Sequence, residues 1–201
     1  MAILETPRLT LLPITLPLVE AVMADRRDEA EALVGARMPA RWPNRELIER
    51  AFVAPLEAIR ADPENGLWGD RVMITRIDEG GGLGAAPVPR VPRVIGSVVF
   101  HGRPGADGVA EVAYGVEEGS QGRGFATEAV RASVAWALRQ PGVRAVQAAT
   151  FGWHVASLRV IEKVGMVAVG VRDHELLGEL QIFETRAGCD GLPAVHASER
   201  R

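Results

Sequence analysis

The stretch EEGSQGRGFATEAV, residues Glu117–Val130, contains three glycines within six positions, directly before a segment of helical character. Gly119, Gly122 and Gly124 can adopt positive φ angles or let the backbone approach a ligand closely. Apolar residues then recur at helical spacing over 127–138. The first N–H groups of a helix lack partners and bear partial positive charge, so such a start attracts anions. The stretch is either a phosphate-binding loop or a plain glycine-rich turn between a strand and a helix.

The flanking sequence indicates a sheet with helices packed on its faces. Alternating or β-branched runs precede the loop and suggest an antiparallel meander, and strand and helix patterns alternate after it. This order predicts an α+β (mixed α/β) fold. The predicted strands are 8–14, 71–77, 94–101, 109–116, 145–150, 167–171 and 179–185. The first predicted helix starts after Thr15, with Pro17 in its first turn, breaks near Asp25 and resumes through Leu33. The other predicted helices are 45–60, 127–138 and 154–164.

Composition excludes several classes of protein. With 201 residues and a formal net charge of −3, the chain has no general electrostatic reason to bind nucleic acid or anionic membranes. Its single cysteine, Cys189, cannot form an internal disulfide, which favours a cytoplasmic location. The histidines show no metal-ligand spacing, so we predict no metal. We expect one domain over 1–187, with a Gly/Pro-rich hairpin loop at 78–93, and a flexible C-terminal tail at 188–201.

Four motifs resemble one family. QGRGFATEA, residues 121–129, resembles the pyrophosphate-binding signature Q/R-x-x-G-x-G/A of the GNAT superfamily of N-acetyltransferases, matched at Gln121, Gly124 and Ala126. SLRVIEKVGM, residues 157–166, resembles the second conserved segment of that superfamily. ETPRLTLLPIT at the start, and VIGSVVF and AEVAYGV in the middle, resemble the RimJ/RimL branch of ribosomal-protein alanine acetyltransferases. The motifs occur in the expected order and span roughly Thr6–Arg186.

This resemblance implies a GNAT-type acyl-CoA N-acyltransferase fold, with a mostly antiparallel twisted sheet and a splayed strand pair. It implies acetyl-CoA as co-substrate, its pyrophosphate held by the glycine loop. It also implies that a bulge splays the strand at 111–116, whose backbone binds the pantetheine arm. A dinucleotide-binding loop is disfavoured, because the loop follows an antiparallel meander. The predicted cofactor-binding residues are Tyr114, Gly115, Val116, Gln121, Gly122, Arg123, Gly124, Phe125, Ala126, Thr127, His154, Ser157 and Lys163.

Two residues are candidates for the chemistry of acetyl transfer to an amine. Glu111 matches an acidic position of the branch and would accept the proton of the amine, directly or through water; otherwise it is a solvated carboxylate at a strand end. Many GNAT members stabilise the departing thiolate with a tyrosine at the position of Ile161. With no tyrosine there, Ser157 is the candidate hydrogen-bond donor, unless its hydroxyl bonds back within the helix.

The resemblance therefore predicts an N-acetyltransferase that transfers the acetyl group of acetyl-CoA to a primary amine by direct attack in a ternary complex. The acceptor is a protein N-terminus or a small-molecule amine. The alternative is a non-catalytic acyl-CoA-binding module with a degenerate site, because His154 stands where the family usually has asparagine. We also predict a homodimer through the apolar strands near the C-terminus.

Overall fold

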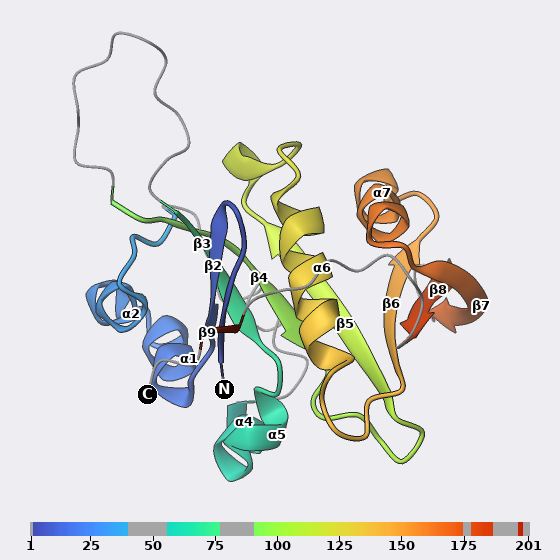
Figure 1. The fold of residues 1–201 in the computed structure, drawn as a ribbon. Coiled ribbons are helices and arrows are strands. Elements are labelled where there is room, and N and C mark those ends of the chain that lie inside the picture. The colour runs from blue at the N-terminus through green and yellow to red at the C-terminus, as the bar shows by residue number, and fades with distance from the viewer. Residues whose placement is uncertain (1, 40–55, 77–90, 175–177, 187–196, 199–201) are drawn as a thin grey trace, which may run out of the picture.

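The computed structural model describes residues 2–39, 56–76, 91–174, 178–186 and 197–198. It contains one sheet, in the order β7-β8-β6-β5-β4-β3-β2-β1-β9 (Figure 1). The strands are β1 (Ile3–Glu5), β2 (Leu9–Pro13), β3 (Arg71–Thr75), β4 (Val94–Phe100), β5 (Val109–Val116), β6 (Ala145–Phe151), β7 (Val167–His174), β8 (Gly178–Arg186) and β9 (Ala197–Ser198). The helices are α1 (Leu16–Met23), α2 (Arg27–Val34), α4 (Leu56–Ala61), α5 (Pro63–Gly66), the 3-10 turn η1 (Glu118–Ser120), α6 (Phe125–Ala137) and α7 (Val155–Val164).

Neighbouring strands of the sheet are antiparallel except for one pair in the middle. The strands β5 and β6 run parallel, and they pair over only three positions, from Val109↔Ala145 to Glu111↔Gln147. Beyond that point residues 112–116 of β5 and 148–151 of β6 have no pairing with each other. The predicted splayed strand pair is therefore confirmed, and we call the opening the β5–β6 gap.

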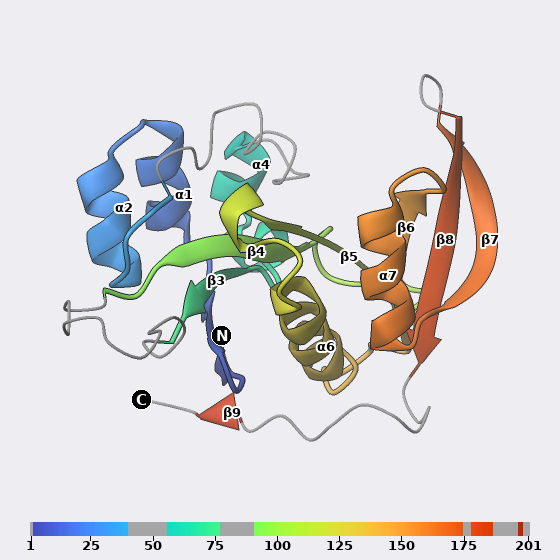
Figure 2. The same cartoon turned by 90° about the horizontal axis from the view of Figure 1, so that it is seen from above.

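Helices cover both faces of the sheet, as the sequence predicted (Figure 2). On one face, α1, α2 and α4 pack over a core that includes Val19, Ile59 and Val99. On the other, α6 and α7 pack over a core that includes Val130, Ile161 and Val112. Because β6 is parallel to β5 and each strand is followed by a helix, α6 and α7 both begin at the edge of the sheet where the gap opens.

Local sequence explains where several helices begin and end. Pro17 stands in the first turn of α1, where its missing N–H costs nothing. Asp25 has a φ of +56°, which breaks the helical path between α1 and α2, as predicted. Thr15 does occupy the N-cap position, but its side chain makes no capping hydrogen bond.

The structure adds four elements that the sequence did not predict: β1, α5, η1 and β9. The two residues of β9 pair with Ile3 and Leu4 of β1, so part of the segment expected to be a flexible tail joins the sheet. Much of the helix predicted at 45–60 and most of the loop predicted at 78–93 lie outside the described residues. The strands that flank this loop, β3 and β4, pair with each other in antiparallel orientation.

Candidate functional site

The β5–β6 gap leaves backbone groups of β5 unpaired on one side. The backbones of Glu111 and Glu117 bond to β4, so the odd-numbered residues between them direct their N–H and C=O groups toward that strand. The even-numbered residues direct theirs into the gap. A linear ligand in the gap would therefore find the N–H and C=O groups of Tyr114 and the N–H group of Val116.

This arrangement corrects two expectations for β5. The register between β4 and β5 continues without a shift from Gly96↔Val116 to Phe100↔Val112, so no bulge of β5 causes the splay. The backbone of Gly115 faces β4 rather than the gap, and it packs closely there. A Cβ built on Gly96 would stand 2.1 Å from the Gly115 carbonyl oxygen. Gly115 thus does not offer its backbone to a ligand in the gap, because β4 already occupies it.

The glycine loop ends at the start of α6, at the open end of the gap. Gly122 and Gly124 have φ angles of +72° and +82°, which L side chains rarely adopt. Gly124 is the N-cap of α6, and no side chain caps this helix. The first-turn amides, including those of Ala126 and Thr127, thus lack a capping side chain and suit an anion.

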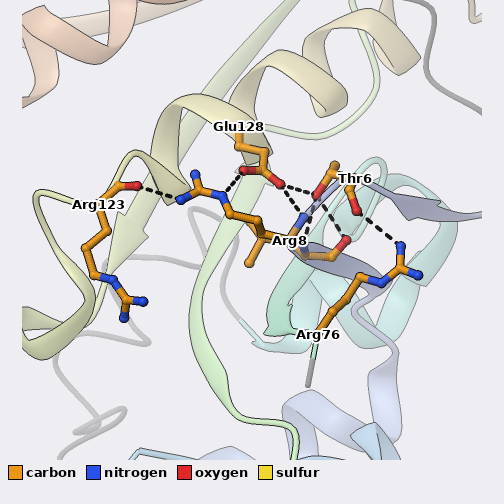
Figure 3. Close-up of polar contacts among 6 residues, drawn as sticks. Thr6, Arg8, Arg76, Arg123 and Glu128 are labelled. Atoms are coloured by element: carbon orange, nitrogen blue, oxygen red, sulfur yellow. Dashed lines mark hydrogen bonds and ion pairs between the residues drawn. The ribbon is translucent and has the colours of Figure 1, made fainter. Parts of the chain in front are cut away.

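Four residues join the N-terminal strands to this loop, and we call them the Arg8 network: Thr6, Arg8, Arg123 and Glu128 (Figure 3). The Glu128 carboxylate accepts hydrogen bonds from Thr6 Oγ1 at 2.6 Å, from the Arg8 amide at 2.9 Å and from Arg8 Nε at 2.7 Å. Arg8 Nη1 also donates to the carbonyl oxygen of Arg123, within the loop, at 2.9 Å. The loop is thereby tied to a segment more than 100 residues away in the chain.

The Arg8 network also sets the charge of Glu128. Burial acts to raise the pKa of this carboxyl, but the hydrogen bonds from Thr6 and Arg8 outweigh burial and lower its pKa below the usual value. Glu128 is therefore an anion at neutral pH. It lies in the first turn of α6.

A pair of hydroxyl groups lies on the α6/α7 face beside the gap. The Tyr114 hydroxyl is 2.9 Å from Ser157 Oγ, and it also donates to the Ser157 carbonyl oxygen at 3.2 Å. Burial raises the pKa of Tyr114, so the phenol stays protonated at neutral pH. The expected tyrosine position on α7 is Ile161, which is buried in the core. A tyrosine hydroxyl nevertheless reaches α7, because β5 supplies it.

Glu111 lies on the opposite face of the sheet, at the last position of β5 that pairs with β6. Its Oε1 atom is 3.6 Å from Nδ1 of His101 and 3.6 Å from Nη2 of Arg172. These distances are longer than hydrogen bonds, so the contacts are at most ion pairs. About a quarter of the Glu111 side chain is exposed, at 27%. The carboxylate is held near two basic side chains but remains accessible.

The alternation of side chains along β5 places these groups on opposite faces. Tyr114 packs against the core under α6 and α7, and Ala113 packs against the core under α1 and α2. Glu111 and Ala113 are two residues apart in β5, so their side chains point to the same face of the sheet. A carboxylate and a hydroxyl pair thus flank the same gap from its two faces.

The remaining predicted residues differ in how close they lie to the gap. Gln121 Nε2 donates to the Val116 carbonyl oxygen at 2.9 Å, so its side chain shapes the loop. The side chain of Phe125 is buried in the core, and only its backbone remains for a ligand. His154 is exposed at the N-cap of α7 but does not cap it.

Lys163 lies on the helix that packs beside α6. It lies in the last turn of α7, and its carbonyl oxygen accepts a hydrogen bond from Arg131 in the middle of α6. Arg131 is six residues beyond Phe125, which at 1.5 Å per residue is about 9 Å along the helix axis. The predicted contact of Lys163 with a cofactor phosphate stays a prediction.

Sequence reasoning missed three contributors to this site: the Arg8–Glu128 contact, the Tyr114 hydroxyl and Arg172. Arg8 lies in the N-terminal motif ETPRLTLLPIT, which resembles the RimJ/RimL branch but by itself assigns Arg8 no contact with the loop. Tyr114 was assigned a backbone role only. No local signal marks Arg172, because its contact with Glu111 joins two strands that are far apart in the chain.

The described residues contain neither a metal-binding cluster nor a membrane-spanning helix. Among them, no three or more histidine, cysteine, aspartate or glutamate side chains gather so that they could hold a metal ion. No helix in the described part of the chain is long and apolar enough to cross a membrane.

Comparison with known proteins identifies the family. The family profile described as Acetyltransferase (GNAT) domain matches residues 8–167. An uncharacterized N-acetyltransferase of Bacillus subtilis, YjdG, is 26% identical over 169 residues, which cover 83% of this chain and 90% of that protein. The chain belongs to the GNAT acetyltransferases, and it is by this membership an acetyl-CoA-dependent N-acetyltransferase.

Solved structures share the fold. A putative GNAT-family acetyltransferase from Bordetella pertussis aligns with a TM-score of 0.58 at 23% identity, over 92% of this chain and 99% of that one. RimL, a ribosomal L7/L12 α-N-protein acetyltransferase solved in complex with coenzyme A, aligns with a TM-score of 0.58 at 12% identity, over 92% of this chain and 97% of that one. These likenesses show that the predicted GNAT fold is correct.

Proposed function

We propose that this acetyltransferase acts on a primary amine, either a protein N-terminus as in the RimJ/RimL branch or a small molecule, by direct attack within a ternary complex. The observation that most supports the proposal is the β5–β6 gap itself. An uncapped helix N-terminus lies at its open end, a hydroxyl pair on one face and an accessible carboxylate on the other. The residues needed at both ends of the reacting bond thus surround one opening.

In this proposal the cofactor lies along the gap. Its pyrophosphate binds the amides of 122–127, where the helix dipole favours an anion. Its pantetheine arm pairs with the backbone of Tyr114, whose N–H and C=O face the gap. The carbonyl of Val116 is already bonded to Gln121, so the arm meets the N–H of Val116 rather than its oxygen.

The proposed chemistry uses one group on each face. The amine nitrogen attacks the thioester carbon, the C–S bond breaks, and Glu111 takes the proton of the amine, directly or through water. The sulfur leaves as a thiolate toward the α6/α7 face, where Ser157 and the Tyr114 hydroxyl donate hydrogen bonds to it. Tyr114 can also supply the proton that completes CoA–SH, since its hydroxyl is protonated at neutral pH.

The test is acetyl-CoA turnover against a panel of amines: peptides with different N-terminal residues, polyamines and aminoglycosides. We expect thiol release with at least one of them. Binding of CoA in calorimetry without thiol release for any acceptor would instead support a non-catalytic acyl-CoA-binding module. Turnover that shows ping-pong kinetics would contradict direct attack, because it indicates a covalent enzyme intermediate.

We further propose that residues 1–187 act as one catalytic domain in the cytoplasm and associate as a homodimer. The edge strand β7 supports the dimer, because its valines Val167, Val169 and Val171 are exposed. Two copies of such a strand can pair across a two-fold axis and cover these valines. Light scattering that gives the monomer mass at working concentration would contradict this proposal.

A further inference from the structure

Arg8 contacts both the Glu128 carboxylate and the glycine loop. Its Nε atom pairs with the Glu128 carboxylate, and its Nη1 atom donates to the Arg123 carbonyl oxygen (Figure 3). Its guanidinium also lies over the ring of Phe125, the first residue of α6, at 4.6 Å from the ring centre. One side chain from the β1–β2 turn thus contacts the glycine loop, the helix start and the acidic residue in its first turn.

Glu128 presents an electrostatic problem that Arg8 solves. A carboxylate in the first turn of a helix is favourable for the empty helix, but it repels a second anion bound at the same N-terminus. Only 15% of the Glu128 side chain is exposed, so water screens its charge poorly. Arg8 supplies the positive charge at 2.7 Å that cancels it.

The two loop glycines before α6 differ in their surroundings. Gly122 has no atom within 4 Å of a built Cβ, and the single neighbour of a Cβ on Gly124 is Arg8 Nη2, at 3.4 Å. The guanidinium of Arg8 therefore lies directly against the residue that caps α6. Removing it would free both the loop carbonyl that it holds and the space beside Gly124.

We infer that Arg8 is a positioning residue for the cofactor: it neutralises Glu128 and ties the loop so that the amides of 122–127 accept a pyrophosphate. The inference rests on the proposed function only in taking this loop as the pyrophosphate site. Thr6 belongs to the same device, because its hydroxyl holds Glu128 Oε1 and bonds with the backbone of Leu9. The β1–β2 turn thus contributes to cofactor binding without contacting the cofactor.

The experiment compares three variants in CoA binding by titration calorimetry. Arg8→Met keeps the aliphatic stem but loses the charge. It should weaken CoA binding about 10-fold, which corresponds to about 1.4 kcal/mol. Glu128→Gln added to Arg8→Met should recover at least about 3-fold of this loss, because the uncancelled charge is gone. Arg76→Met is the matched control. Arg76 contacts the same turn, through the Thr6 carbonyl oxygen and Glu5, but not the loop, so its loss should leave CoA affinity unchanged.

Kinetics separate positioning from general damage. Acetyl-pantetheine lacks the pyrophosphate, so Arg8→Met should raise the KM for acetyl-CoA about 10-fold and leave kcat/KM for acetyl-pantetheine unchanged. Equal losses with both acyl donors would overturn the inference, as would unchanged CoA affinity in Arg8→Met or no recovery in the double variant. Absence of thiol release with every amine would refute the proposed function, whereas the calorimetric comparison would still test Arg8.

Discussion

Beside the β5–β6 gap, Glu111 is held differently from the polar groups on the α6/α7 face. On the α6/α7 face, polar contacts are short: Glu128 accepts hydrogen bonds at 2.6 to 2.9 Å, and Tyr114 and Ser157 are 2.9 Å apart. On the other face, Glu111 has its two basic neighbours at 3.6 Å. A cofactor common to a whole family suits a rigid, fully bonded site, whereas an accessible carboxylate with long contacts can rearrange when an acceptor enters.

The largest effect on kcat/KM should come from Glu111, whose contacts are long. Glu111→Gln keeps the shape of the side chain but cannot accept a proton, so kcat/KM should fall about 10²–10⁴-fold while CoA affinity stays constant. Steady-state kinetics with a verified acceptor and calorimetry with CoA give the two numbers. Since free amine or base becomes available as pH rises, the rate of the wild type should rise with pH, and Glu111→Gln should alter this limb. An unchanged rate and pH profile would assign the proton to a water or to another residue.

The next effect concerns the rigid face. Gly124→Val forces a β-branched side chain to a φ of +82° and against Arg8, and it also blocks close approach of a phosphate. Strain of this kind costs about 1–3 kcal/mol, so CoA binding should weaken by about 10- to 100-fold. Circular dichroism should remain close to that of the wild type.

Gly122 offers the matched control for this prediction. It has a similar φ of +72° but open space where a Cβ would stand. Gly122→Ala and Gly124→Ala carry comparable backbone strain, so a larger loss of affinity at Gly124 isolates the contact with Arg8 and the anion. Equal losses would mean that strain alone explains the glycines.

A smaller effect should follow from removing one hydroxyl of the Tyr114–Ser157 pair. Tyr114→Phe and Ser157→Ala should each lower kcat by about 10-fold, because one hydrogen bond contributes about 0.5–1.5 kcal/mol. If both hydroxyls serve the same thiolate, the double variant should lose less than the product of the two single effects. A kcat that stays at the wild-type value in Tyr114→Phe would leave Ser157 as the donor that the sequence predicted.

Features made by residues close together in the chain could be predicted from the sequence, and contacts between distant residues could not. The loop and α6 were predictable because glycines and helical spacing are adjacent in the chain. The Tyr114–Ser157 contact joins residues 43 positions apart and depends on how α7 packs beside β5. The pairing of Arg8 with Glu128 spans 120 positions. Local periodicity carries no information about such partners.

Two further differences have simple physical causes. The strand β1 is three residues long, too short for its sequence to show alternation of apolar and polar side chains. Its pairing with β2 and β9 defines it as a strand. Thr15 was expected to cap α1 because threonine often does, yet its hydroxyl makes no such bond. Propensity describes what a residue can do, and tertiary contacts decide whether it does so.

Asp70 and Arg71 are neighbouring ionisable residues that do not take part in the β5–β6 gap. Asp70 and Arg71 are buried, and Asp70 Oδ1 accepts a hydrogen bond from the Phe100 amide at 2.6 Å. Burial raises the pKa of Asp70 to about 8, although the Phe100 amide and Arg71 oppose it. Burial also lowers the pKa of Arg71 to about 10. The Arg71 guanidinium stacks over Trp136, at 4.1 Å from the ring centre.

The sign of the pH dependence follows from this raised pKa. Between the ordinary value of 3.8 and about 8 the folded state retains a proton on Asp70 that the unfolded state has lost, so stability falls as pH rises through this window. The lowered pKa values of Glu128 and Glu184 act in the other direction and only at acidic pH. From pH 6 to pH 8, therefore, the Tm of the wild type should fall more steeply than that of Asp70→Asn, which retains the oxygen that accepts from the Phe100 amide but cannot titrate. Parallel Tm curves for the two proteins would show that Asp70 is ionised in the folded state throughout, stabilised by Arg71.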